Sequence, residues 1–512
     1  MEVFKADVLI LGGGLSAYMA AYTLLKKRRK EEIMIVAPGR GDEAAHQLKG
    51  LAVPRVDKDS AAEFYRDILE NGLNQNDPAL VKVLSEESIA VFDRARTIAE
   101  FDMPEEGSRF RPVTGDKNAL WEELSDSVGR HAEIKSGCGC VRLFVQDGRV
   151  QGALCYDSVN RAFFAVSAGT VVLATGGYGE LYRENADIQS LRSAGSGIGL
   201  AYYAGAEMAD LEFAAVQDGE VITLGGVVID SQCRTSLPGL LACGGVTAGV
   251  HGAGLMKGNA ETAALVFGRK AGHTMIRMDF QPGADEEALY KWANETVYIG
   301  QKDQTAAYAR IRQEIAHTLN VCAGEMRTQE KIEDGLKIIA HLQHDLNDLD
   351  LCPLHQVREK MELDFALIAA RLTLLASLER EECCGCYKRA VIHLIEKAPA
   401  EEEPVPEEQP AAKEEAETGA PEPVSDETPD AEQSEADSEE SVNGDSSESL
   451  PEEEPVPSSP EAAEDAAVVC SQPKEPEYEE QIEYIEKEVK PYRVTMKLDN
   501  LILMPKKEPW EN

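Results

Sequence analysis

The chain lacks long apolar runs, an excess of basic charge and a regular spacing of its cysteines. A membrane-spanning helix needs about 20 consecutive apolar residues, and no segment reaches that length, so the sequence predicts no membrane insertion. No basic stretch precedes the first apolar segment, so no secretory signal is indicated. The 11 cysteines do not repeat the spacing of zinc or iron–sulfur ligands. We therefore expect no metal site and a reducing, cytoplasmic location.

Basic residues are the scarcer charge. The chain has 51 Lys and Arg against 92 Asp and Glu, which gives a net charge of −41. Residues 401–480 hold 29 acidic side chains against two lysines, so −27 of that charge lies in one tract and −14 in the rest. Nucleic-acid binding depends on basic patches that neutralise phosphates, and an anionic lipid surface attracts the same residues. We therefore expect binding neither to nucleic acid nor to a lipid surface.

The acidic tract separates two parts of the chain. Residues 397–480 are rich in Pro, Glu, Ser and Ala, which predicts a disordered acidic linker. This linker is either a plain spacer or an acidic ligand for a basic partner. Residues 481–512 regain apolar side chains, and YRVTMKLDNLILMP has the β-branched pattern of one or two strands. Because a lone hairpin is marginal in water, we expect this C-terminal docking segment to bind either the rest of the chain or a protein partner.

A glycine-rich turn near the start of the chain is the clearest motif present. A short apolar strand at 8–11 runs into GGGLSA at 12–17 and then into an alanine-rich helix. Such glycines permit a tight turn and a close backbone approach to a pyrophosphate, whose charge the helix N-terminus favours. The second strand, at 33–36, ends in Ala37 and Pro38 rather than in the acidic residue of a simple NAD site. The pattern therefore predicts a dinucleotide cradle, the alternative being a glycine turn in another α/β protein.

Four longer segments extend this interpretation. They are DKDSAAEFYRDILENGLNQNDPALVKVLSEES, VVLATGGYGELY, GIGLAYYAGAEMADLEF and TSLPGLLACGGVTAGVHGAG. With the glycine turn they resemble, in the same order, the flavoprotein subunits of fumarate reductase and succinate dehydrogenase, and also L-aspartate oxidase. The resemblance implies an α/β fold, with a Rossmann-like FAD-binding domain and a parallel central sheet over 1–275. A helical domain is implied next, and apolar residues at three- and four-residue spacing place it at 285–396.

The cofactor implied by the resemblance is FAD. The histidine that holds a covalent flavin in the family aligns near Glu43, and His46 lies three residues away, so we expect non-covalent binding. The residues expected to bind the cofactor are Gly12, Gly13, Gly14, Leu15, Ser16, Ala17, Thr175, Gly176, Gly177, Gly244 and Asn259.

The departures from the family concern the substrate side. In the family a long insertion forms a capping domain, whereas the corresponding connection here, near 214–224, has about a dozen residues. We therefore expect the capping domain to be absent. Val221 aligns with a substrate histidine and Leu255 with a substrate arginine. Dicarboxylates need fixed cationic partners, and of the family's set only His251 remains, as a weak catalytic candidate or a structural residue. The chain is not expected to act on dicarboxylates by itself.

Two questions stay open in the sequence. The family's helical domain ends in an ESRG-like motif, which Glu382-Cys383-Cys384-Gly385-Cys386 replaces here. These cysteines are either buried thiols or a pair capable of reversible oxidation. The resemblance implies a FAD-dependent oxidoreductase or electron-transfer flavoprotein, with a non-catalytic flavin-binding subunit or a scaffold without FAD as alternatives. A protein partner or redox subunit is then expected to bind through the C-terminal segment.

Overall fold

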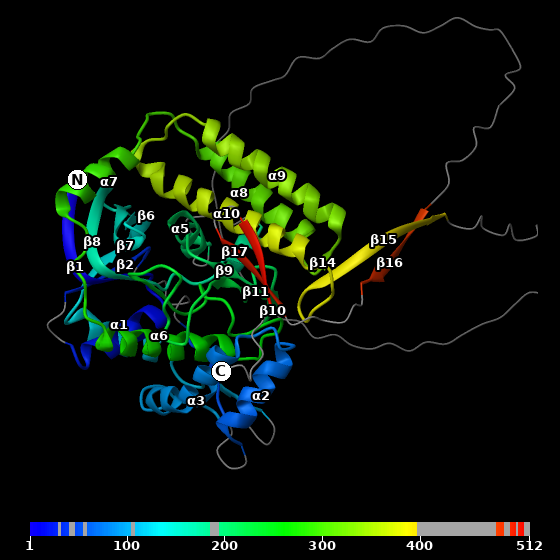
Figure 1. The fold of residues 1–512 in the computed structure, drawn as a ribbon, viewed down its shortest axis with the longest axis horizontal. Helices are drawn as coiled ribbons and strands as arrows, with labels where there is room; N and C mark the ends of the chain where they lie inside the picture. The colour runs from blue at the N-terminus through cyan, green and yellow to red at the C-terminus, as the bar shows by residue number, and fades with distance from the viewer. Residues whose placement is uncertain are drawn as a thin grey trace, which may run out of the picture. The chain divides into compact units, whose positions relative to one another are not determined.

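The computed structural model describes residues 1–28, 32–39, 47–54, 59–103, 108–184, 194–396, 478–485, 492–497 and 500–505. Most of the predicted acidic linker, residues 397–477, therefore lies outside the described residues. The chain divides into one unit of 1–393 with 481–512 and a second unit of 394–480. The first unit contains the helices that Figure 1 labels from α1 to α10.

A parallel-dominated sheet forms the centre of the first unit. Its strands lie in the order β5-β2-β1-β8-β7-β6, and β13 pairs with β8 outside that path. The pairs from β5 to β8 and the β8–β13 pair are parallel, whereas β7 and β6 are added antiparallel. The predicted α/β fold with a parallel central sheet is thereby confirmed. The strands are β1 (Glu2–Leu11), β2 (Ile33–Ala37), β5 (Glu133–Ser136), β6 (Cys138–Gln146), β7 (Arg149–Asp157), β8 (Ala162–Leu173) and β13 (Leu240–Ala242).

Apolar residues run without a break through the middle strands of this sheet. Residues 8–11 of β1 and 33–37 of β2 are all buried, as expected for parallel strands that are covered on both faces. The helices α1 (Leu15–Leu25) and α6 (Asn259–Arg277) lie side by side in Figure 1. They can approach closely because Gly268 has no side chain: a Cβ there would lie 2.6 Å from the carbonyl oxygen of Ser16.

Three helices and a small sheet lie between β2 and β5 in the sequence. Side-chain caps fix the start of two helices, because Ser60 accepts a hydrogen bond from the N–H of Glu63 and Asp77 accepts one from the N–H of Ala79. The elements are β3 (Gly50–Ala52), α2 (Ala61–Asn71), α3 (Pro78–Ala95), β4 (Phe110–Pro112) and α4 (Ala119–Gly129).

Long amphipathic helices follow the central sheet, as the spacing of apolar residues predicts. The helices α8, α9 and α10 lie together at the top of Figure 1. The helix α10 also packs on α5, where the ring of Phe365 contacts Gly199, a position at which any side chain would overlap that ring. The elements are α5 (Ser196–Ala204), α7 (Glu286–Thr296), α8 (Thr305–Cys322), α9 (Gln329–Asp348), α10 (Val357–Glu379) and the 3-10 turns η2 (Gly179–Tyr182) and η4 (Leu354–Gln356).

A short hairpin occupies the connection at which the family has its capping domain. Strands β10 (Ala214–Gln217) and β11 (Glu220–Thr223) pair antiparallel, with Ala214 opposite Thr223 and Gln217 opposite Glu220. The two turn residues Asp218 and Gly219 have φ of 52° and 78°, the left-handed conformation of a type I′ turn. The base of the hairpin is fixed, because the Thr223 hydroxyl accepts a hydrogen bond from the N–H of Tyr178 at 3.2 Å.

The C-terminal segment returns to the first unit. The strand β17 (Tyr492–Lys497) pairs antiparallel with β9 (Met208–Ala209), which gives a sheet in the order β12-β9-β17-β18 with β12 (Gly226–Val227) and β18 (Asn500–Pro505) at its edges. A further sheet has the order β14-β15-β16. Its strands are β14 (Met326–Arg327), β15 (Lys388–Glu396) and β16 (Tyr478–Tyr484). No helix within the described ranges is long and apolar enough to span a bilayer.

Candidate functional site: a dinucleotide cradle and its surroundings

The glycine turn after β1 has the backbone conformation that the motif predicts. Gly12 adopts a φ of +125°, and a Cβ there would overlap the carbonyl oxygen of Ala174, so only glycine fits at this position. A Cβ on Gly14, in contrast, would meet no atom within 4 Å. The structure therefore leaves open space at Gly14, where the motif brings the backbone closest to a pyrophosphate.

The first turn of α1 is suited to an anion. Its N-cap residue is Gly14, no side chain caps the helix, and no acidic residue lies in the first turn. The first hydrogen bond of the helix runs from the N–H of Tyr18 to Gly14, so the N–H groups of Leu15, Ser16 and Ala17 have no acceptor within the helix. Free N–H groups and the positive end of the helix dipole together favour bound phosphate.

The carboxyl ends of three neighbouring strands meet at this turn. Leu11 at the end of β1 is in register with Leu173 at the end of β8, which is in register with Ala242 at the end of β13. The turns that follow these strands begin the segments 12–17, 175–177 and 244–245. Ligands of open α/β sheets bind at this edge, so the structure brings together predicted residues that are far apart in the sequence.

Two predicted cofactor residues carry polar atoms that have no protein partner. The hydroxyl oxygen of Thr175 and the amide oxygen of Asn259 are buried, and neither makes a hydrogen bond within the described part of the chain. Asn259 is 1% exposed and begins α6. Buried polar groups are usually satisfied, so these two atoms fit a polar ligand. Gly244 completes the contact with α1, since a Cβ there would lie 2.6 Å from the Ser16 hydroxyl oxygen.

Sequence reasoning missed one side chain that supports the cradle. The indole N–H of Trp121, on α4, donates a hydrogen bond to the carbonyl oxygen of Gly13 at 3.2 Å. The same indole makes an edge-to-face contact with Tyr18, with ring centroids 5.6 Å apart. No local pattern around Trp121 signals this contact, because it depends on how α4 packs against the turn.

The arrangement as a whole fits a dinucleotide. Open space at Gly14, an uncapped helix N-terminus and two unpartnered buried oxygens lie where the motif requires them. The region around Glu43 and His46, from which non-covalent attachment is inferred, lies outside the described residues. Gly176 and Gly177 lie in the turn after β8, as expected. The part of each residue in cofactor binding stays a prediction.

The substrate side of the site is apolar at the aligned positions that the structure describes. His251 is half-buried, and burial lowers the pKa of its imidazole to about 4, so the ring is neutral at pH 7. Its Nδ1 makes no hydrogen bond to any described residue. Leu255 packs against a small cluster that includes the inner side of the hairpin. The cluster consists of Phe213, Leu224, Ala253, Cys384 and Tyr387, with Ala215, Ile222, Leu255 and Cys386 packed against it.

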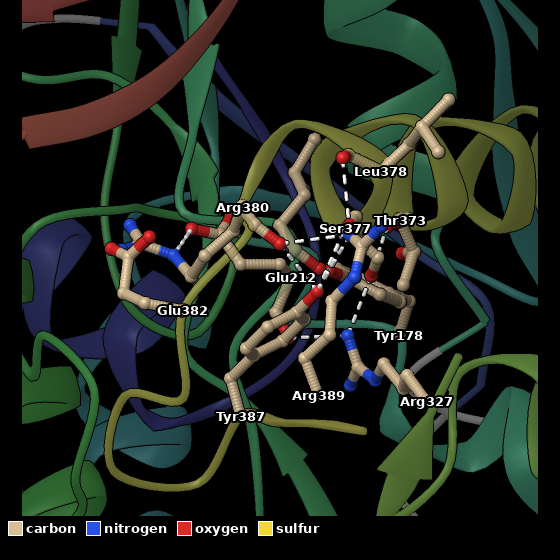
Figure 2. A network of polar contacts seen from close by, with 11 residues as sticks. Tyr178, Glu212, Arg327, Thr373, Ser377, Leu378, Arg380, Glu382, Tyr387 and Arg389 are labelled. Atoms are coloured by element: carbon tan, nitrogen blue, oxygen red, sulfur yellow. Dashed lines mark hydrogen bonds and ion pairs between the residues drawn. The ribbon is translucent and has the colours of Figure 1, made fainter. Parts of the chain in front are cut away.

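A buried ionic network joins the hairpin to the end of α10. Figure 2 shows Arg380 between two carboxylates: its Nε lies 2.8 Å from Glu212 and its Nη1 2.9 Å from Glu382. The side chains of Arg380 and Glu212 are 0% exposed. Burial raises the pKa of the Glu212 carboxyl and Arg380 opposes that rise. The second oxygen of Glu212, Oε2, has no hydrogen-bond partner among the described residues.

Two further buried arginines bind backbone and hydroxyl oxygens in the same network. Arg327 donates hydrogen bonds to the carbonyl oxygen of Glu212 at 2.9 Å and to the hydroxyl of Ser377 at 2.6 Å. Arg389 donates to the carbonyl oxygens of Ser377 at 2.9 Å and Arg380 at 2.9 Å. Figure 2 shows these side chains converging on the end of α10. The network therefore orients the segment that enters the hairpin, and sequence reasoning did not identify it.

The cysteine turn that replaces the family's ESRG-like motif contacts the His251 segment. The N–H of Cys386 donates a hydrogen bond to the carbonyl oxygen of Ala253 at 2.8 Å. Cys384 is buried, and burial raises the pKa of the Cys386 thiol to about 11. Across the described ranges, no group of three or more His, Cys, Asp or Glu side chains could hold a metal ion.

Comparisons with known proteins agree with this architecture. The sequence matches the FAD binding domain family over residues 7–219 and 214–260, and the fumarate reductase flavoprotein C-terminal family over residues 312–393. A subunit of the fumarate reductase (CoM/CoB) of Methanothermobacter marburgensis is 24% identical over 524 residues, covering 76% of this chain and 94% of that protein. L-aspartate oxidase of Halobacterium salinarum is 22% identical and covers 78% of this chain and 99% of that protein.

Solved structures show the same fold. A mutant of E. coli quinol fumarate reductase FrdA gives a TM-score of 0.65 at 17% identity, over 80% of this chain and 94% of that chain. Adenylylsulfate reductase from Archaeoglobus fulgidus gives a TM-score of 0.62 at 14% identity, over 74% of this chain and 90% of that chain.

These matches, with the cradle described above, define a flavoprotein whose cofactor is FAD, as the sequence predicts. The protein is a FAD-dependent oxidoreductase by class. Within that class it belongs to the family of fumarate reductase and succinate dehydrogenase flavoprotein subunits, and the resemblance stated from its motifs is confirmed.

Proposed function

We propose that this chain is an electron-transfer flavoprotein that does not act on dicarboxylates by itself. The observation that carries the proposal is the chemistry at the two aligned substrate positions, where Val221 and Leu255 supply no charge. A carboxylate leaves water at a net gain only if fixed cations replace its hydration. His251 is neutral at pH 7, since its pKa is lowered to about 4. The described side chains therefore offer a dianion no cationic partner at these positions.

The nearby arginines do not replace the missing cations. Arg380 is engaged by Glu212 and Glu382, and both Arg327 and Arg389 bind protein oxygens in the buried network. Freeing any of them for a substrate would break contacts within the core, which is costly for buried charges. This consumption of cations by the fold supports the proposal.

The short hairpin supports transfer of electrons to another protein. FAD supplies both one-electron and two-electron chemistry when bound, and the residues proposed to hold it non-covalently are those of the cradle at Gly12, Gly14, Thr175 and Asn259. Small-molecule redox chemistry usually requires a site that closes and excludes water. A hairpin of ten residues, Ala214–Thr223, covers far less than a domain. We therefore propose that the capping domain is absent and that the acceptor is a protein.

A protein partner is also consistent with the relatives, whose names identify several of them as subunits. We propose that the C-terminal segment is the contact. The strand β18 pairs with β17 on one side and is an edge of its sheet, and an edge strand can accept a strand from another chain. The proposed division is a FAD-binding domain at 1–275, a helical domain at 285–396, a linker at 397–480 and a docking segment at 481–512. A non-catalytic flavin subunit is the second candidate, favoured by the same missing cations.

A purified sample tests these proposals directly. We expect a flavin visible spectrum, and complete release of FAD into the supernatant after acid or heat precipitation. Colour that stays with the denatured chain would contradict non-covalent binding. We also expect no saturable fumarate reduction with reduced viologen dye, because loss of one transition-state contact typically costs a factor of about 100 or more. Fumarate turnover at an enzymatic rate would refute the proposed function while leaving the flavoprotein assignment intact.

A further inference from the structure

The first turn of α6 contains a carboxyl group that the family does not have there. The family's serine–leucine pair aligns with Ala260 and Glu261, so Glu261 takes the place of an apolar residue. It lies two positions after Asn259, whose buried amide oxygen has no partner among the described residues. The two side chains thus share the helix N-terminus that borders the cradle.

Backbone contacts fix β3 against this end of α6. The N–H of Ala52 donates to the hydroxyl of Thr262 at 2.9 Å and to the carbonyl oxygen of Gly258 at 3.2 Å. The Thr262 hydroxyl in turn donates to the carbonyl oxygen of Ala52 at 2.9 Å. Glu261 is therefore held on a rigid part of the first unit.

The tip of the hairpin reaches the same place through two ion pairs. Lys49, just before β3, lies 2.9 Å from Glu220, and Lys257, just before α6, lies 3.5 Å from Asp218. Both pairs are exposed, so each is worth little stability and is screened by salt. Together they bring two cations and two carboxylates around Glu261, which adds a third carboxylate. The group therefore carries one excess negative charge whenever Glu261 is ionised.

The surroundings of Glu261 favour its protonated form. Burial is the largest influence and raises the pKa of its carboxyl, and the charges of Asp218 and Glu220 raise it further. The backbone N–H of Glu261 and the charge of Lys49 oppose this rise. A carboxyl in this balance responds to a new charge nearby by taking up or releasing a proton.

We propose that Glu261 takes up a proton from water when the bound FAD is reduced, and that its charge sets the midpoint potential of the cofactor. Two-electron reduction by an external reductant adds negative charge to the cofactor. An ionised carboxylate beside the site disfavours that charge, and its protonation by one proton from solvent removes the penalty. The inference rests on the bound FAD and on no assumption about substrate or partner.

Redox titrations of the full-length flavoprotein test this inference. We expect Glu261→Gln to raise the midpoint potential, because the substitution removes a negative charge at almost constant shape. At pH 8.5 the equilibrium constant for reduction should rise about threefold or more, where tenfold corresponds to about 30 mV for a two-electron couple. The difference from wild type should shrink as the pH is lowered, because Glu261 becomes neutral in the wild type too.

Two further variants separate charge from structure. Lys49→Met removes a cation from the same group and should lower the midpoint potential, whereas a merely structural disturbance would move both variants in the same direction. Glu330→Gln, in the first turn of α9 and exposed, is the matched control and should change nothing. The FAD dissociation constants of the apoproteins, measured for oxidised and reduced cofactor, must reproduce each shift in potential.

The outcomes are distinct from those of the proposed function. A Glu261→Gln shift below about threefold at pH 8.5, or a shift that does not depend on pH, overturns the inference. If Glu261→Gln fails to fold, a Lys49→Met variant with an unchanged midpoint potential overturns it equally. Neither result touches the proposed lack of dicarboxylate turnover, which is measured separately with fumarate.

Discussion

Replacing Arg380 with methionine should destabilise the protein severely. The guanidinium group is 0% exposed and lies 2.8 Å from Glu212 and 2.9 Å from Glu382. Methionine fills a similar length but leaves both carboxylates buried without their cation. Removing one partner of a buried ion pair costs about 3–5 kcal/mol, which is a large part of a domain's stability of about 5–15 kcal/mol.

The pH dependence of this loss follows from Glu212. Its pKa is raised above the ordinary value mainly by burial, and Arg380 lowers it, so in Arg380→Met the pKa must rise further. The folded state then binds a proton more tightly than the unfolded state does, and stability increases as the pH falls through the folded pKa. The gap between variant and wild type should therefore be largest at alkaline pH and narrow as the pH is lowered.

Urea unfolding followed by circular dichroism measures the effect at several pH values. The double variant Arg380→Met, Glu212→Gln removes one of the stranded carboxylates and should recover about half of the loss. Lys337→Met, which breaks an exposed pair with Asp334 at 2.7 Å, is the control and should leave the unfolding midpoint unchanged. A loss below about 1 kcal/mol for Arg380→Met, or a gap that widens on acidification, would refute the reasoning.

Two other predictions concern the cofactor cradle and the substrate side. Gly14→Val should leave the melting temperature of the apoprotein unchanged and weaken FAD binding on the order of tenfold or more, because the new side chain enters open space; Gly139→Val, also open, is its control, and unchanged FAD affinity would contradict the cradle. The pKa of His251 is lowered from 6.5 to about 4, so the folded state resists protonation and stability should fall as the pH drops from 6.5 to 4, by up to about 3 kcal/mol. His251→Gln should lose this component, and an identical pH profile for wild type and variant would count against a buried neutral ring.

The sequence determined those features that depend on local steric and periodic rules. A φ of +125° at Gly12 requires glycine whatever the rest of the chain does, so the turn after β1 could be predicted from its residues. The uninterrupted apolar runs of β1 and β2 identified buried parallel strands, and spacing identified α7 to α10. The two strands expected within 492–505 are present as β17 and β18. The order of the motifs identified the family and FAD.

Tertiary structure alone decided which distant residues share a site. Thr175, Gly244 and Asn259 approach Gly14 only because parallel pairing aligns the ends of β1, β8 and β13, and register is a long-range property. The bond from Trp121 to Gly13 and the pairing of β17 with β9 depend in the same way on packing. The enclosure of Arg380 between carboxylates 168 and two positions away was beyond the sequence. Its charge pattern does not reveal which ions are buried, and burial sets the energy of an ion pair.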